Sequence, residues 1–139
     1  MVKVELEEIA VSGDDNQFLA LLKSGDGEIL PIAIDAMQAI SIAAGRSNEK
    51  LERPLTHDLF VSVLEMLGVE VARVEVTDLV DGTYYAMLVL ERGGVRFDVD
   101  ARPSDALALA VRVKAPVYVA EHVLQQSALK DEFGGGAEA

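Results

Sequence analysis

Two groups of alternating apolar and polar residues, each interrupted by glycine-containing turns, constrain this chain most. The first group covers residues 2–34 and the second covers residues 69–99. Alternation with a period of two predicts β-strands that bury one face. Asp81-Gly82 and Gly93-Gly94 are typical of tight hairpin turns, and Ser24-Gly25-Asp26-Gly27 is a turn of the same kind in the first group. The sequence therefore predicts two three-stranded β-meanders.

A first helix is predicted directly after the first meander. Asp35 is suited to cap a helix over residues 36–44, because its carboxylate can accept from the free amides of the first turn. Gly45 is expected to end this helix. One apolar face of the helix carries Met37, Ile40 and Ala44.

Two further helices are predicted on either side of the second meander. One covers residues 56–67, with Thr56 as its N-cap and Gly68 as its stop. The other covers residues 106–113 and is almost entirely apolar, so it is expected to be buried on most sides. The helix over residues 56–67 has an apolar stripe that consists of Leu59, Phe60, Val63, Leu64 and Leu67.

The order of these elements indicates the fold class. A short buried strand is predicted at residues 117–119 and a last helical segment at residues 121–129. Helices stand between meanders instead of alternating with single strands, which favours an α+β fold. We expect an antiparallel or mixed sheet, built from the two meanders, with three main helices packed against it. Residues 1–130 should form one domain, and residues 131–139 a disordered tail.

The composition excludes several classes of protein. The chain has 139 residues and no cysteine, so disulfides and thiolate catalysis are excluded, and a reducing cytoplasm is the expected location. The charged N-terminus is unlike a signal peptide, and no apolar run reaches the ~20 residues of a membrane helix. The mean hydropathy of +0.24 indicates a dense core or a buried oligomer face.

The net charge of −12 argues against broad binding of nucleic acid, because the field of the protein repels phosphate. A polyanionic substrate would need a local cluster of arginines or bound metal ions. The acidic balance is therefore evidence against a protein that binds nucleic acid, unless such a cluster exists.

Two segments place similar side chains at the start of a predicted helix: Arg53-Pro54-Leu55-Thr56-His57-Asp58 and Arg102-Pro103-Ser104-Asp105. Proline suits a helix start, serine or threonine can cap it, and an acid complements its dipole. Local structure alone can thus explain the Pro, Ser, Thr and Asp residues. Arginine opposes the dipole at this position, so Arg53 and Arg102 are candidates to bind a phosphate, together with Thr56 and Ser104.

Acidic residues and a histidine complete the candidate site. His57 could transfer a proton near neutral pH, or could simply be hydrogen-bonded in its helix. Asp98 and Asp100 alternate along one strand, so they face the same side and could bind a divalent metal such as Mg²⁺ or Mn²⁺. The alternative is that Asp100 pairs with Arg102 or Arg53. Arg112 is expected to complement the C-terminal dipole of its helix.

At these positions the sequence resembles the bifunctional nuclease family of bacteria and plants. The resemblance extends from Met1 to about Leu129, and its sharpest parts are Arg53–Leu59, Asp78–Ala86, Asp98–Ala110 and Ala115–Val119. It implies a homodimer of wedge-shaped form, with DNase and RNase activity in a groove at the thick end. It also implies DNA or RNA as partner. If the chain is such a nuclease, its candidate catalytic residues are His57, which would transfer a proton, and Asp58, Asp100 and Asp105, which would hold a metal ion or orient the other groups.

Two other interpretations remain open. The chain could be a non-catalytic oligomeric module, in which the same arginines bind a small anion or a protein partner. The Arg-Pro segments could also serve only to hold the fold together, through buried pairs of arginine and aspartate. Whether Arg53, His57, Asp100 and Arg102 converge on one open groove would distinguish these interpretations.

Overall fold

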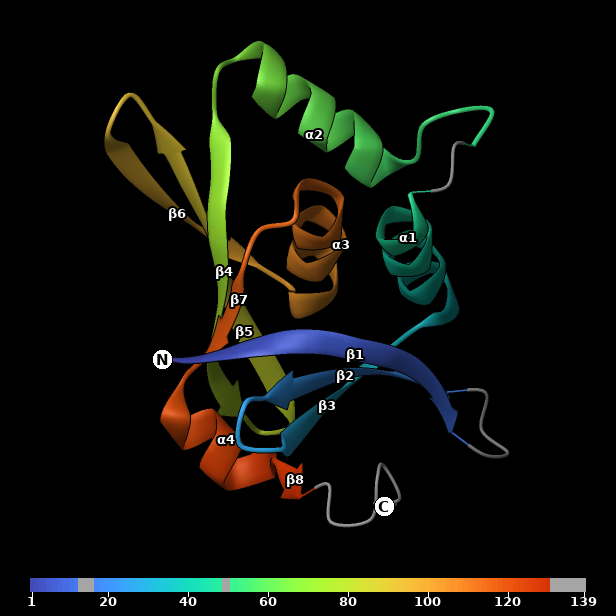
Figure 1. Cartoon of the computed structure of the whole chain (residues 1–139), viewed down its shortest axis with the longest axis vertical. Coiled ribbons are helices and arrows are strands. Elements are labelled where there is room, and N and C mark those ends of the chain that lie inside the picture. Colours follow the sequence, from blue (N-terminus) through green and yellow to red (C-terminus); the bar gives the residue numbers. More distant parts are fainter. Residues whose placement is uncertain (13–16, 49–50, 131–139) are drawn as a thin grey trace.

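The computed structural model describes residues 1–12, 17–48 and 51–130 (Figure 1). The tail expected at residues 131–139 lies outside the described residues. Within them, one mixed sheet has the strand order β6-β5-β4-β7-β1-β2-β3-β8. Its strands are β1 (Val2–Ser12), β2 (Gln17–Ser24), β3 (Glu28–Ile34), β4 (Glu70–Val80), β5 (Thr83–Arg92), β6 (Val95–Ala101), β7 (Val117–Val119) and β8 (Leu129–Lys130).

The two predicted meanders are confirmed as β1-β2-β3 and β4-β5-β6. Both central residues of the turn between β4 and β5 have positive φ, 51° at Asp81 and 81° at Gly82. This conformation matches the twist of the strands that it joins, which is why Asp-Gly is favoured there. The short β7 joins the meanders, because it pairs antiparallel with β1 and parallel with β4.

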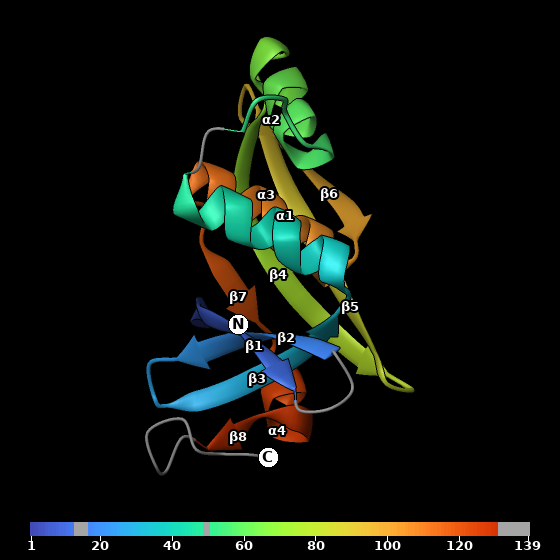
Figure 2. The same cartoon turned by 90° about the vertical axis from the view of Figure 1, so that its right-hand side faces the viewer.

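Four helices accompany the sheet in the described part of the chain: α1 (Ala36–Ser47), α2 (Thr56–Met66), α3 (Pro103–Val113) and α4 (Glu121–Ser127). Figures 1 and 2 show α1 and α3 side by side, with α2 at one end of the molecule and α4 at the other. The α+β class and the three main helices are therefore as the sequence predicts. None of these helices, among the residues described, has the length and apolar character needed to cross a membrane.

The core lies between α3 and the sheet. Every residue from Ala106 to Ala110 is buried, which confirms the prediction for this apolar helix. On the sheet, the same core includes Val74 of β4, Leu88 of β5 and Val119 of β7. Because α3 is buried on most of its surface, it fixes the positions of the two other helices that contact it, α1 and α2.

Helix α1 differs from the prediction at its C-terminal end and in the face that it buries. Gly45 does not end α1; the helix continues to Ser47, and Asn48 follows in the left-handed conformation with φ 58°. The face with Met37 points outward, since Met37 is 73% exposed. The buried residues are instead Ile42, which is fully buried, and the small residues Ala39, Ser41 and Gly45, which let α1 approach α3 closely. The Asp35 cap is confirmed by the 2.8 Å hydrogen bond from the backbone N–H of Gln38.

The predicted caps of α2 and α3 are wrong by one or two positions. Leu55 occupies the N-cap position of α2, so Thr56 is already the first helical residue. The carboxylate of Asp58 accepts the backbone N–H of Leu55 at 2.8 Å and satisfies the helix start in place of a threonine hydroxyl. In α3 the N-cap position belongs to Arg102, so Ser104 is no cap either, whereas Pro103 lies at the helix start as predicted.

Candidate functional site

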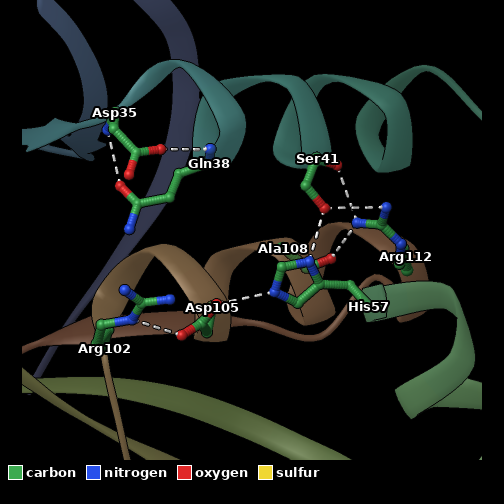
Figure 3. Close-up of polar contacts among 8 residues, drawn as sticks. All are labelled: Asp35, Gln38, Ser41, His57, Arg102, Asp105, Ala108 and Arg112. Atoms are coloured by element: carbon green, nitrogen blue, oxygen red, sulfur yellow. Dashed lines mark hydrogen bonds and ion pairs between the residues drawn. The ribbon is translucent and has the colours of Figure 1, made fainter. Parts of the chain in front are cut away.

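His57 in the first turn of α2 extends between α1 and α3 (Figure 3). Its Nδ1 lies 2.6 Å from Ser41 Oγ, and its Nε2 lies 2.9 Å from Asp105 Oδ1. An ionised carboxylate can only accept, so Nε2 must carry a proton and donate it to Asp105. In the neutral ring Nδ1 then accepts from the Ser41 hydroxyl. One imidazole therefore connects three helices, and both its nitrogens have protein partners.

Asp105 is bound from two sides. Arg102 Nε donates to Asp105 Oδ2 at 2.7 Å, while His57 occupies the other carboxylate oxygen. Burial by itself raises the pKa of Asp105, but the hydrogen bonds from Arg102 and His57 outweigh burial and leave the pKa below its ordinary value. Asp105 is therefore ionised at neutral pH. The Arg102 side chain is 68% exposed, so much of its guanidinium faces solvent.

Arg112 forms the buried end of the same network. Its side chain is only 7% exposed, and its Nε donates to Asp58 Oδ1 at 2.7 Å. Its Nη1 donates to the carbonyl oxygens of Ser41 at 3.0 Å and Ala108 at 2.8 Å. Its Nη2 lies 3.3 Å from Ser41 Oγ. The hydrogen bond from Arg112 is also the main reason why the pKa of Asp58 lies below its ordinary value.

These contacts form one directional series of donors. Arg112 donates to Ser41, Ser41 donates to His57, and His57 donates to Asp105. Arg102 donates to Asp105 from the opposite side. Ser41 was not predicted as a site residue, and Arg112 was expected only to complement the dipole of its helix. A polar residue on the apolar side of α1 and an arginine within an apolar helix were the signals that could have identified them.

A cavity of about 280 Å³ adjoins the start of α3 and is lined by Arg102, Ser104, Thr83, Tyr84 and Gln38, among others. Ser104 is only 5% exposed, and its hydroxyl has no hydrogen-bond partner among the described residues. No fully buried side-chain oxygen or nitrogen in that part of the chain lacks a partner, so the Ser104 hydroxyl must remain accessible. The first backbone amides of α3 and Arg102 add positive potential here, which suits an anion.

Asp98 and Asp100 are not brought to this cluster. On β6, Asp98 pairs with Val89 and Asp100 with Met87, whereas the intervening Val99 pairs with the core residue Leu88. Directly paired residues share a face of the sheet, so both aspartates lie on the face opposite the helices.

The residues proposed for metal binding are a poor fit to a metal ion. Asp98 is already bound to Arg96 at 2.6 Å. No group of three or more His, Asp or Glu residues that could hold a metal ion occurs within residues 1–12, 17–48 and 51–130. Two exposed carboxylates, one of them paired with arginine, do not make up the ligand set of a protein site for Mg²⁺ or Mn²⁺.

The first Arg-Pro segment contributes to the cluster only through its histidine and aspartate. Arg53 and Thr56 are exposed, and neither side chain has an interaction partner among the described residues. His57 and Asp58 face inward, toward α1 and α3. The structure thus joins His57, Asp58, Arg102 and Asp105 in one network and leaves Arg53, Thr56, Asp98 and Asp100 outside it.

Comparison with known proteins identifies relatives of this chain. Residues 20–132 match the family model described as the bifunctional nuclease domain. A Mycobacterium tuberculosis protein, described as uncharacterized, is 40% identical over 130 residues, which cover 93% of this chain and 77% of the relative. Bifunctional nuclease 2 of Arabidopsis thaliana is 31% identical over 112 residues, or 78% of this chain and 34% of the plant protein. Bifunctional nuclease 1 of Oryza sativa subsp. indica is 30% identical over 115 residues, with coverage of 79% and 35%.

Proposed function

The chain belongs to the bifunctional nuclease domain family, and we propose that it is a nuclease that hydrolyses phosphodiester bonds of DNA and RNA. The observation that carries this proposal is the placement of His57 and the exposed Arg102 on the two oxygens of one carboxylate, that of Asp105. A proton-transferring group and a phosphate-binding group are thereby held next to each other by the Asp105 side chain, which binds both. This chain spans about a third of the plant nucleases, so their activity is transferred to it only as part of the proposal.

In this proposal Arg102 binds the phosphate. Only its Nε is used by Asp105, so both Nη groups remain to bind two oxygens of a phosphodiester. The Ser104 hydroxyl and the first amides of α3 supply further donors at the same end of the helix. These donors stabilise the charge that develops on the phosphate oxygens in the transition state. A local site of this kind allows a protein with a net charge of −12 to bind a polyanion.

His57 transfers the proton. Its Nδ1 faces Ser41, which is buried, whereas its Nε2 faces Asp105, whose side chain is 34% exposed. Exchange therefore takes place at Nε2, where the ring in its charged form gives its proton to the leaving oxygen of the phosphodiester. The ring is then neutral and keeps its other proton on Nδ1, which faces Ser41 Oγ. The Asp105 carboxylate orients the charged ring and stabilises it before the transfer. Asp58 has a positioning role, because it fixes Arg112, which in turn binds Ser41.

The experiment is an assay of single-stranded RNA and DNA cleavage with protein purified until activity and protein elute together. His57→Ala should lower kcat by about 100-fold or more, in the range of a lost proton transfer. His122→Ala is the matched control, since His122 is exposed and its one hydrogen-bond partner among the described residues is Asp78. Arg102→Ala should raise KM as well as lower kcat. Activity that separates from the protein, or a His57→Ala protein with full activity, would overturn the proposal.

A second candidate function is the binding of a small anion without catalysis. It is favoured by the fact that both ring nitrogens of His57 are already occupied by protein partners. In this second function the histidine holds three helices together and transfers no proton. Stabilisation by a mononucleotide, combined with no cleavage of polymer by the pure protein, would support this function over the nuclease.

A homodimer is the proposed assembly. Helix α2 has no buried residue, and Met66 is 85% exposed. β6 is an edge strand, and its apolar Val95, Phe97 and Val99 are all exposed. Figures 1 and 2 place α2 and the β5–β6 hairpin at the same end of the molecule. A second copy that offers the same surface would cover both the apolar side chains and the unpaired strand edge.

A further inference from the structure

The cavity of about 280 Å³ at the start of α3 receives polar groups from α1 as well as from α3. Its lining also includes part of β3 and the start of β5. Arg102 is the one charged residue among the described residues that line it, and no acid is among them. The whole chain has 24 acidic and 12 cationic residues, so a wall with an arginine and no acid departs from the overall balance and favours an anion.

Gln38 on α1 presents an amide nitrogen to this cavity. Its Oε1 accepts the backbone N–H of Asp35 at 2.7 Å, and a backbone N–H can only donate, so the orientation of the amide is fixed. The Nε2 group is therefore the end that points away from Asp35, and it has no partner among the described residues. Figure 3 shows it on the side of α1 that faces Arg102.

Ser104 on α3 supplies a second free donor. The residue is 5% exposed, and its hydroxyl has no hydrogen-bond partner in the part of the chain that the structure describes. No fully buried side-chain oxygen there lacks a partner, so the hydroxyl must open into the cavity that Ser104 lines. A polar group enclosed in this way is satisfied only by a water molecule or by a bound ligand.

Three side chains from two helices thus line one cavity with N–H or O–H groups: Gln38, Arg102 and Ser104. Arg102 uses only its Nε for Asp105, so both Nη groups remain. Asp35 interacts with the charge of Arg102, but its carboxylate caps α1 and it is not among the lining residues. A set of donors from a planar guanidinium, an amide and a hydroxyl suits a ligand with several acceptor oxygens, as in a phosphate.

The rest of the cavity suits a pentose better than a base. An amide side chain reads a base with its oxygen and its nitrogen together, and the oxygen of Gln38 is already bound to Asp35. The volume lies just below the ~300 Å³ at which small-molecule sites usually begin, so the cavity admits one nucleotide unit at most. Its apolar wall consists of Ile34, Pro103 and the half-buried Tyr84, which suits the face of a sugar ring.

We propose that this cavity binds one pentose phosphate unit of a nucleic acid, with the phosphate on Gln38, Arg102 and Ser104 and the sugar against Tyr84, and that it does not read the base. Gln38 is thereby a third phosphate-binding side chain, contributed by α1. This inference rests on the proposed function, from which it takes the polymer to which the unit belongs. Binding of the unit itself requires no cleavage.

The test is an NMR titration of the full chain with ribose 5-phosphate, cytidine 5′-monophosphate, adenosine 5′-monophosphate and cytidine. Ribose 5-phosphate and both nucleotides should shift the amide signals of Gln38, Ser104 and Asp105 saturably, with Kd values within threefold of one another. Cytidine, which has the base and the sugar but no phosphate, should not saturate. Inorganic phosphate should bind at the same amides at least fivefold more weakly than ribose 5-phosphate, because it leaves the sugar position empty.

Gln38→Glu is the decisive variant, because a glutamate at this helix position accepts the same backbone N–H and keeps the cap of α1. It replaces the free N–H groups by an anionic oxygen, so the Kd of ribose 5-phosphate should rise at least tenfold. Ser104→Ala removes the hydroxyl without adding bulk and should raise the Kd at least threefold. Gln125→Glu is the charge-matched control, since Gln125 is exposed on α4, no residue of which lines the cavity. It should leave the Kd within twofold of the unaltered protein.

The proposal is overturned if ribose 5-phosphate causes no saturable shift at these amides, if cytidine saturates there, or if Gln38→Glu binds ribose 5-phosphate as tightly as Gln125→Glu does. Failure of the nuclease proposal has a different result. In that case ribose 5-phosphate binds as expected, while the pure protein cleaves no polymer.

Discussion

Arg112 Nε lies 2.7 Å from Asp58 Oδ1, and this contact joins the last turn of α3 to the first turn of α2. Helix α2 has no fully buried residue, although its Val61 and Leu64 pack against the core. This pair and the His57 contacts add polar attachments of α2 to α1 and α3. The orientation of His57 therefore depends on an arginine that forms no hydrogen bond with it, through Asp58 and Ser41.

Arg112→Met should lower the free energy of unfolding. The substitution leaves Asp58 and the Ser41 carbonyl without their donor, while the apolar stem of the side chain is kept. A lost hydrogen bond to a charged group costs about 1.5–3 kcal/mol, and because Asp58 can regain water we expect the lower half of that range. Urea denaturation measures the change. Arg112→Lys should not restore stability, because an ammonium cannot bind Asp58 and both carbonyls in the same planar geometry; full rescue by lysine would contradict the assigned contacts.

Gly45→Ala should destabilise the protein although alanine is the better helix former. In a helix interior the exchange normally gains about 0.5–1 kcal/mol. Here the added Cβ would lie 2.5 Å from Arg112 Nη1 and 2.9 Å from Val111 Cγ2. Overpacking of this kind costs about 1–3 kcal/mol, so the sign of the effect is reversed. Thermal unfolding provides the measurement, and Gly25→Ala, with open space around it, is the control. An increase in Tm for Gly45→Ala would show that α1 and α3 are less closely packed than described.

Stability should fall at acid pH, through Asp58 and Asp105. Both have a pKa below the ordinary value of about 3.9, Asp58 mainly because of Arg112 and Asp105 because Arg102 and His57 outweigh its burial. Below about pH 4 the unfolded chain therefore binds more protons than the folded one. The contribution of the two carboxylates to the free energy of unfolding is present above that pH, and it is lost as the pH falls through their lowered pKa values. Asp58→Asn should flatten the dependence of unfolding free energy on pH below about pH 4. Asp81→Asn, in an exposed turn, is the control.

Met66→Lys should convert the proposed dimer into a monomer. Met66 is the most exposed large apolar side chain of α2, and a buried, unpaired ammonium would oppose association. Light scattering after size-exclusion chromatography gives the mass directly. Met37→Lys on α1 is the control, because Met37 is similarly exposed but lies on a different helix. The proposed surface is wrong if the unaltered protein is monomeric, or if both variants dissociate alike.

The strands were predictable because alternation and turn residues are local signals. Asp81-Gly82 determines its hairpin by its own backbone conformation, and the apolar run of α3 has no alternative to burial. The site was less predictable. Ser41 and Arg112 act through partners 16 and 71 positions away in the sequence, and no periodicity encodes such contacts.

The buried face of α1 was predicted wrongly because it, too, is determined by a contact with a segment distant in the sequence. In α1 hydrophobicity favours the face with Met37 and Ile40, yet close approach to α3 requires the small side chains on the other face. An apolar helix face that is exposed in one copy of the chain can be the contact surface of an assembly. Sequence periodicity does not distinguish such a face from one that is buried in the core.

The position of β7 has a consequence for the order in which the fold forms. Its three residues separate the two meanders in space but follow both of them in the sequence. During synthesis, neither half of the sheet can join the other until Val119 has left the ribosome. Until then, Val2–Val4 of β1 and Val74–Val76 of β4 present unpaired edges. The slow step of folding should therefore be the late insertion of this strand, and a chaperone that shields strand edges would act in that interval.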